Sequence, residues 1–352
     1  MTIFDIMETL VSVEGSDIHL VVGSPPTIRI HGDLRTLEGA TPLTEKEAGE
    51  LILPLMTQEQ KDYVRVNKEL DFGYSFQDRG RFRINVYTNR GTMGAAMRLV
   101  PKNIKTIEDL KLPPIVSQFA NFPQGLVLIT GPTGEGKSTT LAALIDLINA
   151  TRGEHIVTVE DPIEFIYEPK KSIISQRELN HDTNSWELAL RSVLREDPDV
   201  VLIGEMRDYE TISSALTIAE TGHLVFGTLH TSTAAETIDR IVDVFPAHQQ
   251  GQVRQQLAAT VRVIASQRLL KAEGGGRIAG MEILISNSAV KNLIREGKTH
   301  QIDTVIQTGA DAGMILFEGH LLQLMQQGAI SAETAMESAF RPTEMKRLMG
   351  KE

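Results

Sequence analysis

The sequence predicts an α/β protein in which a small α+β domain precedes a parallel β-sheet covered by helices. Three observations predict this fold class. Strand-like runs separated by turn residues fill residues 1–100, apolar runs alternate with long helical segments from residue 125, and the pattern after residue 286 is mostly helical. At 352 residues, the chain is long enough for about two domains, each with its own core.

The first predicted domain spans residues 1–100 and has α+β character. Glycine, proline and asparagine separate its short runs, and a helical pattern between the strands has a break near Pro54. Turn signals at hairpin spacing, at residues 78–80 and 89–91, separate the last three strands. The predicted strands are residues 19–22, 27–31, 70–76, 81–87 and 93–100, and the predicted helical segment is residues 45–67.

Prolines interrupt the pattern after the last of these strands, so an interdomain linker is predicted at residues 101–115. The second predicted domain spans residues 116–352, with a helical C-terminal region from about residue 286. Short apolar runs separated by long helical segments are typical of a parallel sheet. These predicted strands are residues 126–130, 156–159, 200–203 and 224–228.

Composition limits where the protein works and what it binds. The formal net charge of −11 repels a phosphate backbone, so no nucleic-acid partner is expected. The absence of cysteine excludes disulfides and cysteine-ligated zinc. No apolar run is long enough to span a membrane, and the first residues lack a signal-peptide pattern. We therefore expect a cytoplasmic protein without an integral membrane segment, with a peripheral membrane role left open.

A phosphate-binding loop (P-loop) follows the strand predicted at residues 126–130. The motif G-x-x-x-x-G-K-[ST] lies between this strand and a helix that begins near Lys137. Backbone amides of the loop would surround the phosphates of ATP, Lys137 would contact the β and γ oxygens, and Ser138 would offer its hydroxyl to Mg²⁺. The predicted nucleotide-binding residues here are Gly131, Pro132, Thr133, Gly134, Glu135, Gly136, Lys137, Ser138 and Thr139.

Carboxylates follow two other predicted strands. Glu205 comes after residues 200–203, and at the carboxyl end of a parallel strand it would hold Mg²⁺ together with Ser138. The carboxylates within residues 160–164 follow the strand at 156–159, and one of them would orient the attacking water. Acidic strand ends are also ordinary solvated turns, and this alternative stays open. The combination predicts hydrolysis of Mg-ATP.

Histidines lie at both ends of the strand at residues 224–228. His223 precedes it and His230 follows it, with Thr228 and Thr231 nearby. Such a pair would sense the γ-phosphate of ATP, although a lone histidine at a strand end is more often a structural hydrogen-bonding residue.

Arginines alternate with apolar residues on the strands of the first domain. Phe82, Ile84 and Val86 are expected to face its core, so Arg81 and Arg83 would share the outer face with Arg98 of the next strand. From the residues alone, a solvated charged face is the favoured interpretation.

Together these motifs resemble the secretion ATPase superfamily, and most closely its type IV pilus retraction (PilT) family. The resemblance covers nearly the whole chain, and the absence of the tetracysteine zinc motif of pilus-extension and type II secretion ATPases favours retraction. The matching segments are residues 16–20, Gly32 with Asp33, the P-loop, an aspartate box at 159–164, residues 195–199 leading to Glu205, a histidine box at 221–223 and 227–231, residues 239–242, and Phe245 with Pro246.

The resemblance implies a PAS-like first domain, a RecA-like ATPase core and a ring-shaped homohexamer that works with an inner-membrane platform protein and pilins at the pilus base. It implies that Glu164 is the catalytic glutamate and Glu205 the Walker B glutamate, and that His223 and His230 belong to the nucleotide site. Arginines that reach the nucleotide of a neighbouring subunit would be Arg83 and Arg98.

Two positions depart from the family pattern. Glu135 places a carboxylate in a loop where small residues are usual, and Lys291 stands where the family has arginine in a C-terminal motif that begins at Ala289. Glu135 bears on nucleotide affinity, and Lys291 bears on how hydrolysis drives retraction. The alternative hypotheses are an accessory or paralogous pilus motor, a nucleotide-binding regulator with low turnover, and a RecA-like DNA motor, which the acidic composition disfavours.

Overall fold

A computed structural model describes residues 1–30, 32–76, 79–100 and 103–350. The chain divides into two compact units. The first comprises Met1–Asn103 and Pro162–Ile166, and the second comprises Ile104–Asp161 and Tyr167–Glu352. Residues 31, 78, 101 and 102, which fall in a predicted strand, a predicted turn and the predicted linker, lie outside the described residues.

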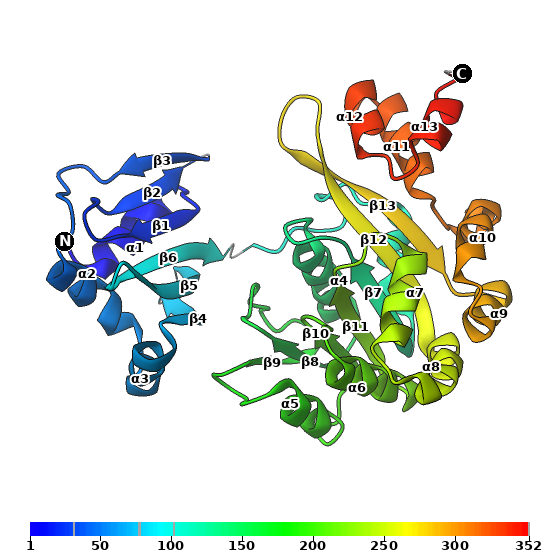
Figure 1. The fold of residues 1–352 in the computed structure, drawn as a ribbon, viewed down its shortest axis with the longest axis horizontal. Helices are drawn as coiled ribbons and strands as arrows, with labels where there is room; N and C mark the ends of the chain where they lie inside the picture. The colour runs from blue at the N-terminus through cyan, green and yellow to red at the C-terminus, as the bar shows by residue number, and fades with distance from the viewer. Residues whose placement is uncertain (31, 77–78, 101–102, 351–352) are drawn as a thin grey trace. The chain divides into compact units, whose positions relative to one another are not determined.

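The first unit is an antiparallel sheet with helices, in strand order β3-β2-β1-β6-β5-β4 (Figure 1). Phe82, Ile84 and Val86 of β5 are fully buried, as the alternation predicted. The elements are α1 (Ile3–Ser12), β1 (Asp17–Leu20), β2 (Thr27–Ile30), β3 (Asp33–Thr36), α2 (Glu45–Ile52), η1 (Leu53–Leu55), α3 (Gln58–Asn67), β4 (Glu69–Phe76), β5 (Gly80–Asn89) and β6 (Thr92–Val100).

The helical segment of this unit is broken where proline predicted it. Thr44 caps α2 and Thr57 caps α3, each in a capping box in which a side chain three residues later bonds back to the threonine amide. Pro54 lies between them in the 3-10 turn η1, because proline has no N–H to continue the α-helical bonding. Residues 45–67 therefore form two helices and a turn.

The second unit is a seven-stranded sheet in the order β13-β12-β7-β11-β10-β8-β9. All neighbouring strands from β12 to β9 are parallel, and β13 is antiparallel to β12. The strands are β7 (Gly125–Thr130), β8 (His155–Glu160), β9 (Ile173–Glu178), β10 (Val200–Ile203), β11 (Leu224–Leu229), β12 (Val261–Lys271) and β13 (Arg277–Ile285). The parallel sheet of a RecA-like core is confirmed, but the sequence analysis did not predict β9, β12 or β13.

Helices separate most of these strands and continue to the C-terminus, where the mostly helical pattern is confirmed. They are η2 (Pro114–Asn121), α4 (Lys137–Thr151), α5 (Trp186–Val193), α6 (Tyr209–Glu220), α7 (Ala234–Asp243), α8 (Ala247–Thr260), α9 (Ser288–Glu296), η3 (Thr299–Gln301), α10 (Ile302–Thr308), η4 (Ala310–Ala312), α11 (Phe317–Gln326), α12 (Ala332–Ser338) and α13 (Pro342–Leu348). Residues 104–115 of the predicted linker belong to this second unit, and Ile107 and Leu112 are buried there. This part of the predicted linker is therefore packed against the second unit.

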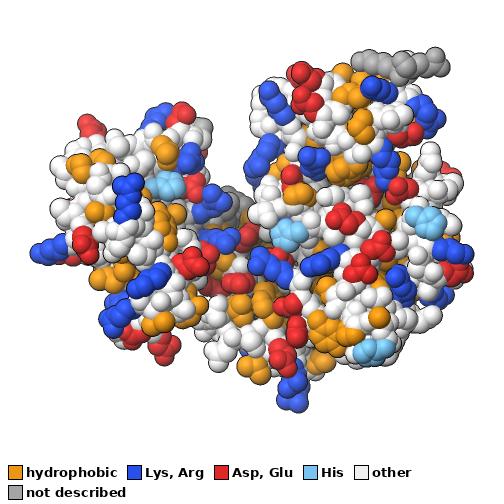
Figure 2. All heavy atoms as spheres, in the orientation of Figure 1, with side chains coloured by type: hydrophobic (Ala, Val, Ile, Leu, Met, Phe, Trp, Pro, Cys, Tyr) orange, Lys and Arg blue, Asp and Glu red, His pale blue; other side chains and the backbone are white. Residues whose placement is uncertain are grey.

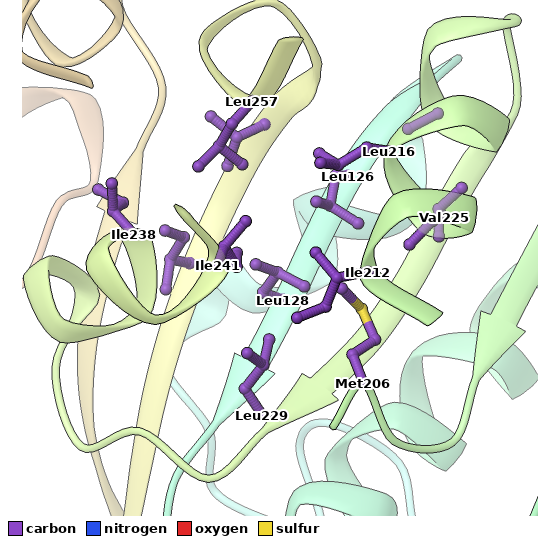
Figure 3. Close-up of a cluster of buried hydrophobic side chains, with 14 of the residues drawn as sticks. Leu126, Leu128, Met206, Ile212, Leu216, Val225, Leu229, Ile238, Ile241 and Leu257 are labelled. Carbon is purple, nitrogen blue, oxygen red and sulfur yellow. The ribbon is translucent and has the colours of Figure 1, made fainter. Parts of the chain in front are cut away.

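An apolar core fixes the central strands. One cluster of buried side chains joins the central strands to two helices (Figure 3). It includes Leu126 and Leu128 of β7, Val225 of β11, Ile212 of α6 and Ile241 of α7. Burial of each large apolar side chain contributes roughly 1.5–3 kcal/mol to the stability of the folded state. The core therefore holds the strands in a fixed register, and with them the loops at their carboxyl ends.

The C-terminal helices pack on the hairpin formed by β12 and β13 (Figure 1). Leu270 and Ile278 of the hairpin are buried against Phe317 and Leu321 of α11, and Met345 of α13 completes the cluster. On the face drawn in Figure 2, acidic and basic side chains are interspersed with apolar ones. Within the described residues, no helix is long and apolar enough to cross a membrane.

Candidate active site

The carboxyl ends of three parallel strands lie side by side in the second sheet. β11 lies between β7 and β10, with Thr228 opposite Ile129 on one side and Gly227 opposite Ile203 on the other. Because parallel strands run in one direction, the loops that follow them lie together at the carboxyl ends of the strands. These loops carry the P-loop, Glu205 and His230.

Glycine is needed at two positions of the P-loop. A Cβ atom at Gly131, where φ is 142°, would lie 2.3 Å from the carbonyl oxygen of Gln267. A Cβ atom at Gly136, where φ is 80°, would lie 2.9 Å from Nε2 of Gln267. Among the described residues, no side chain caps α4, which begins directly after Gly136. The backbone amides at a helix amino end suit an anion such as a phosphate.

Lys137 is the basic residue of this loop. It is buried, and its Nζ donates hydrogen bonds to the carbonyl oxygens of Gly131 at 2.7 Å and Pro132 at 2.9 Å. These bonds fix the ammonium group against the loop. The loop can therefore neutralise phosphate charge with both backbone dipoles and a fixed cation.

The carboxylate of Glu135 is directed toward β12. It accepts a hydrogen bond from the backbone N–H of Leu269, while the Glu135 carbonyl accepts one from Nε2 of Gln267 at 2.6 Å. Oε1 of Gln267 in turn accepts a bond at 2.7 Å from Thr140 of α4. Sequence reasoning missed Gln267, which ties the P-loop to β12. In the sequence, Gln267 stands beside Ser266 and Arg268, so no local pattern distinguishes it.

His230 joins the P-loop to Glu205. Its Nε2 lies 2.6 Å from Oε1 of Glu205, and its Nδ1 lies 3.4 Å from Oγ1 of Thr133 in the P-loop. The backbone supports this arrangement, because Met206 N–H donates to the Thr228 carbonyl at 2.9 Å. Three residues predicted from separate motifs are thus brought together by the order of the strands.

Glu205 is an ionised carboxylate in this site. Partial burial raises its pKa, but a hydrogen bond from Arg207 and the positive field of His230 and Arg207 outweigh that effect, so the pKa lies below its ordinary value. Sequence reasoning missed Arg207, which follows Glu205 by two positions. The carboxylate therefore stays charged at neutral pH and available to a cation.

The donor set fits Mg²⁺. Within the described ranges no group of three or more His, Asp or Glu side chains could hold a metal by itself. Magnesium in phosphoryl-transfer sites is usually held by one or two protein oxygens, with water and phosphate oxygens as the other ligands. The Ser138 hydroxyl in the first turn of α4 and the Glu205 carboxylate are the oxygens that would hold it.

His223 lies at the opposite end of β11 from the P-loop. It precedes β11, at the strand end where Leu224 pairs with Gly125, whereas the P-loop follows Thr130 at the far end of β7. Six residues of strand span roughly 17–20 Å. Within one chain, His223 therefore lies at the opposite end of β11 from the P-loop, and its place in a nucleotide site stays a prediction. Its Nδ1 lies 3.0 Å from the carbonyl oxygen of Ile218 and has a structural partner there.

The carboxylates predicted at residues 160–164 are divided between the two units. Glu160 ends β8 in the second unit and is buried, with Oε1 accepting a hydrogen bond from Thr158 at 2.7 Å. Glu164 belongs to the first unit, where Oε1 lies 3.7 Å from Nη1 of Arg83. The role of Glu164 in hydrolysis stays a prediction.

The arginines of the first unit share one face of its sheet. Arg83 of β5 pairs directly opposite Arg98 of β6. Nε of Arg98 donates to Asp17 at 2.8 Å, yet 72% of the Arg98 side chain is exposed, and Arg83 is 41% exposed. Arg81 hydrogen-bonds to Ser75 on the neighbouring strand at 3.2 Å. Arg83 and Arg98 thus present guanidinium groups to the surroundings of the first unit.

Comparison with known proteins identifies the family. The model of the family described as "Type II/IV secretion system protein" matches residues 2–349. The chain belongs to this family. It is 48% identical to the "Type IV pilus retractation ATPase PilT" of Pseudomonas aeruginosa, over 93% of this chain and 95% of that protein. It is 50% identical to a "Twitching motility protein" of Neisseria gonorrhoeae, over 89% of this chain and 84% of that protein.

A solved structure extends the match to three dimensions. The chain is similar to the crystal structure of "the Pilus Retraction Motor PilT and Bound ADP", with 45% identity, a TM-score of 0.92 and coverage of 99% of both chains. Both units of this secretion-family chain therefore have counterparts in one protein. Lys291, the departure noted in the C-terminal motif, lies on α9, where Asn287 caps the helix and Val290 is buried.

Proposed function

We propose that the protein is an ATP-hydrolysing motor that drives retraction of a type IV pilus. The observation that carries the ATPase assignment is His230, which contacts Glu205 and the P-loop residue Thr133 at one sheet edge. A loop that binds phosphate, a carboxylate that stays charged and a histidine that touches both would respond together to the γ-phosphate. The similarity to a pilus retraction ATPase over nearly the whole chain supports the motor assignment.

Each residue has a definite task in this mechanism. The amides of the P-loop and Nζ of Lys137 bind the phosphates, and Ser138 and Glu205 hold Mg²⁺, which neutralises charge on the phosphates when bound. Glu164 orients and deprotonates the attacking water, and His230 contacts the γ-phosphate side of the site. Phosphoryl transfer needs mainly positioning and charge stabilisation, and these groups supply both.

The protein works as a homohexamer in which Arg83 or Arg98 completes the nucleotide site of a neighbouring subunit. Both arginines are on one face of the first unit, and the exposure of Arg98 leaves its guanidinium accessible to another chain. Arginine supplied by a neighbour is a known way to stabilise the charge of phosphoryl transfer. The ring would act at the cytoplasmic side of the inner membrane, on a platform protein and the pilins at the pilus base.

The alternative hypothesis of a nucleotide-binding regulator with low turnover has lost its main support. That hypothesis depended on Glu135, because a carboxylate in the phosphate cradle would repel ATP. The Glu135 carboxylate instead accepts a hydrogen bond from Leu269 on β12. The regulator would nevertheless be distinguished from the motor by turnover of the purified protein.

Two measurements test the proposal. The purified chain should hydrolyse ATP in a Mg²⁺-dependent reaction, and a strain that lacks it should carry abundant surface pili that no longer retract. Pilus retraction can be followed by imaging labelled pili. Absence of turnover would contradict the ATPase assignment, and loss of pili altogether would indicate an extension motor instead.

A further inference from the structure

A cluster of titratable side chains, some buried and some half-buried, lies far along the sequence from the P-loop. We define the Arg341 cluster as Glu282 of β13, Asp303 of α10, Glu318 and His320 of α11, and Arg341, which precedes α13. Arg341 donates from its backbone N–H and from Nη1 to the two oxygens of Glu318, each at 2.8 Å, and its Nη2 bonds to Asp303. Glu282 and Glu318 have no exposed surface. A buried network of this kind is a costly feature to keep for packing alone.

Glu282 connects this cluster to α7. Its Oε1 accepts a hydrogen bond at 2.9 Å from the backbone N–H of Ala234, the first residue of that helix. Its Oε2 lies 4.0 Å from Nη1 of Arg341 and has no hydrogen-bond partner among the described residues. One carboxylate therefore faces the amino end of α7 with one oxygen and the guanidinium with the other.

The amino end of α7 holds the loop that carries His230. Thr231 and Thr237 share a buried hydrogen bond of 2.7 Å, and the Ser232 N–H donates to Glu236 at 2.8 Å. These bonds attach the residues directly after His230 to the first turns of the helix. A displacement of the start of α7 would therefore move His230 relative to Glu205 and Thr133.

The cluster has more negative than positive groups. Burial raises the pKa of Glu282 to about 7, and the nearby Asp303 and Glu318 raise it as well, while the Ala234 N–H and Arg341 oppose them. His320, which accepts a hydrogen bond from the Met281 N–H, is kept neutral by burial, which lowers its pKa to about 4. Glu282 is thus the member of the cluster that changes charge near neutral pH.

We propose that Glu282 and Arg341 are positioning residues for His230, which transmit the placement of the C-terminal helices to the nucleotide site through the amino end of α7. An ionised Glu282 makes a charge-assisted hydrogen bond and suits the positive end of the helix. Arg341 favours that ionised form, and a shift of α11 or α13 that moves Arg341 weakens it. The inference rests on the proposed ATPase function of the same site.

The first test compares variants of the full chain by steady-state ATPase kinetics between pH 6 and pH 8.5. Glu282→Gln keeps the shape and the acceptor for the Ala234 N–H but loses the charge. We expect kcat at pH 8 to fall about tenfold with KM for ATP within about twofold, because orientation is lost rather than binding. The wild-type rate should fall toward that of the variant as the pH drops below 7, and the variant should lack this step.

Arginine variants separate charge from packing. Arg341→Met should move the pH step upward by about one unit, because Glu282 loses its cation, and Arg341→Lys should restore part of the wild-type profile. Arg347→Met is the matched control, since it removes an exposed ion pair with Glu344 on the adjacent helix α13. A Glu282→Gln profile identical to wild type, or an Arg347→Met profile altered as much as Arg341→Met, would overturn the inference.

The second test does not require turnover. Hydrogen exchange of the backbone amides at residues 230–237, measured in the intact protein with Mg-ADP, should be faster in Glu282→Gln and Arg341→Met than in wild type and Arg347→Met. Unchanged exchange overturns the inference even if the wild-type chain hydrolyses ATP. If the wild-type chain shows no hydrolysis, the proposed function fails, and faster exchange would still support the link between Arg341 and α7.

Discussion

The two units use their polar residues in different ways. At the carboxyl ends of the strands of the second sheet, one chain brings together Lys137, Glu205 and His230, which follow neighbouring strands. On the first unit, Arg83 and Arg98 stand opposite each other on a sheet face and pair with carboxylates, while much of each side chain stays exposed. The first arrangement is assembled by its own backbone, and the second still offers guanidinium groups to another molecule.

This difference separates what one chain can do alone from what needs an assembly. We expect the P-loop and Glu205, which lie at the carboxyl ends of neighbouring strands of one chain, to be sufficient for binding Mg-ATP. In the proposed mechanism the arginine that stabilises charge belongs to the first unit, so we expect binding to survive changes in that unit and turnover to depend on them. The following predictions test that division, beginning with the largest expected effect.

Lys137→Ala should abolish hydrolysis, with a loss of about a thousandfold or more, because the phosphates lose the fixed cation of the loop. Glu205→Ala should lower turnover about a hundredfold and raise the Mg²⁺ concentration required. Phosphate release assays across a Mg²⁺ titration measure both effects. Lys46→Ala, at a lysine side chain that is 85% exposed, is the control. Near wild-type turnover of either variant in excess Mg-ATP would show that the site is wrongly assigned.

Arg98→Ala and Arg83→Ala should each lower turnover about a hundredfold while ATP affinity changes little, because the arginine acts on transition-state charge in a neighbouring site. Mixed rings give the decisive measurement. Arg98→Ala chains keep the P-loop and Lys137→Ala chains keep the arginine, so some interfaces of a mixed ring are complete and should recover part of the activity. Arg35→Ala, on the exposed strand β3, serves as the control. Confirmed subunit exchange without recovery for either arginine would argue against a shared site.

Glu164→Gln should bind ATP with near-normal affinity but hydrolyse it roughly fifty times more slowly, because the amide keeps the shape and loses the charge that activates water. Binding is measured with a fluorescent nucleotide and turnover by phosphate release. An equal loss of both would make this carboxylate structural, in keeping with its ion pair to Arg83.

His320→Gln should change stability rather than catalysis. Burial lowers the pKa of His320 from 6.5 to about 4, so the unfolded chain binds more protons between these values and stability is lost as the pH falls through this range. At pH 5 this effect of His320 lowers the free energy of unfolding by about 2 kcal/mol relative to neutral pH. Glutamine can still accept from the Met281 N–H, so urea denaturation of the variant should show a smaller difference between pH 7.5 and pH 5. A wild-type pH dependence in the variant would contradict the buried, neutral state of His320.

Most of the fold followed from local patterns. Alternation in residues 81–87 predicted the buried face of β5, Pro54 predicted the break between helices, and apolar runs predicted four strands of the parallel sheet. The strands that were missed have less distinct patterns. β9 has one buried position among its residues, and the apolar run of β12 is interrupted by Ser266, Gln267 and Arg268.

The candidate site divides in the same way. The sequence by itself determined that the P-loop, Glu205 and His230 each follow an apolar strand, and their roles toward phosphate and Mg²⁺ stay predictions. Only the tertiary structure decided that His223 lies at the opposite end of β11 from the P-loop and that Glu135 is directed toward β12. It also decided that Gln267 and Glu282 support the loops around the nucleotide site. The physical reason is that strand order and side-chain partners far apart in sequence are fixed by packing, which local residue patterns do not encode.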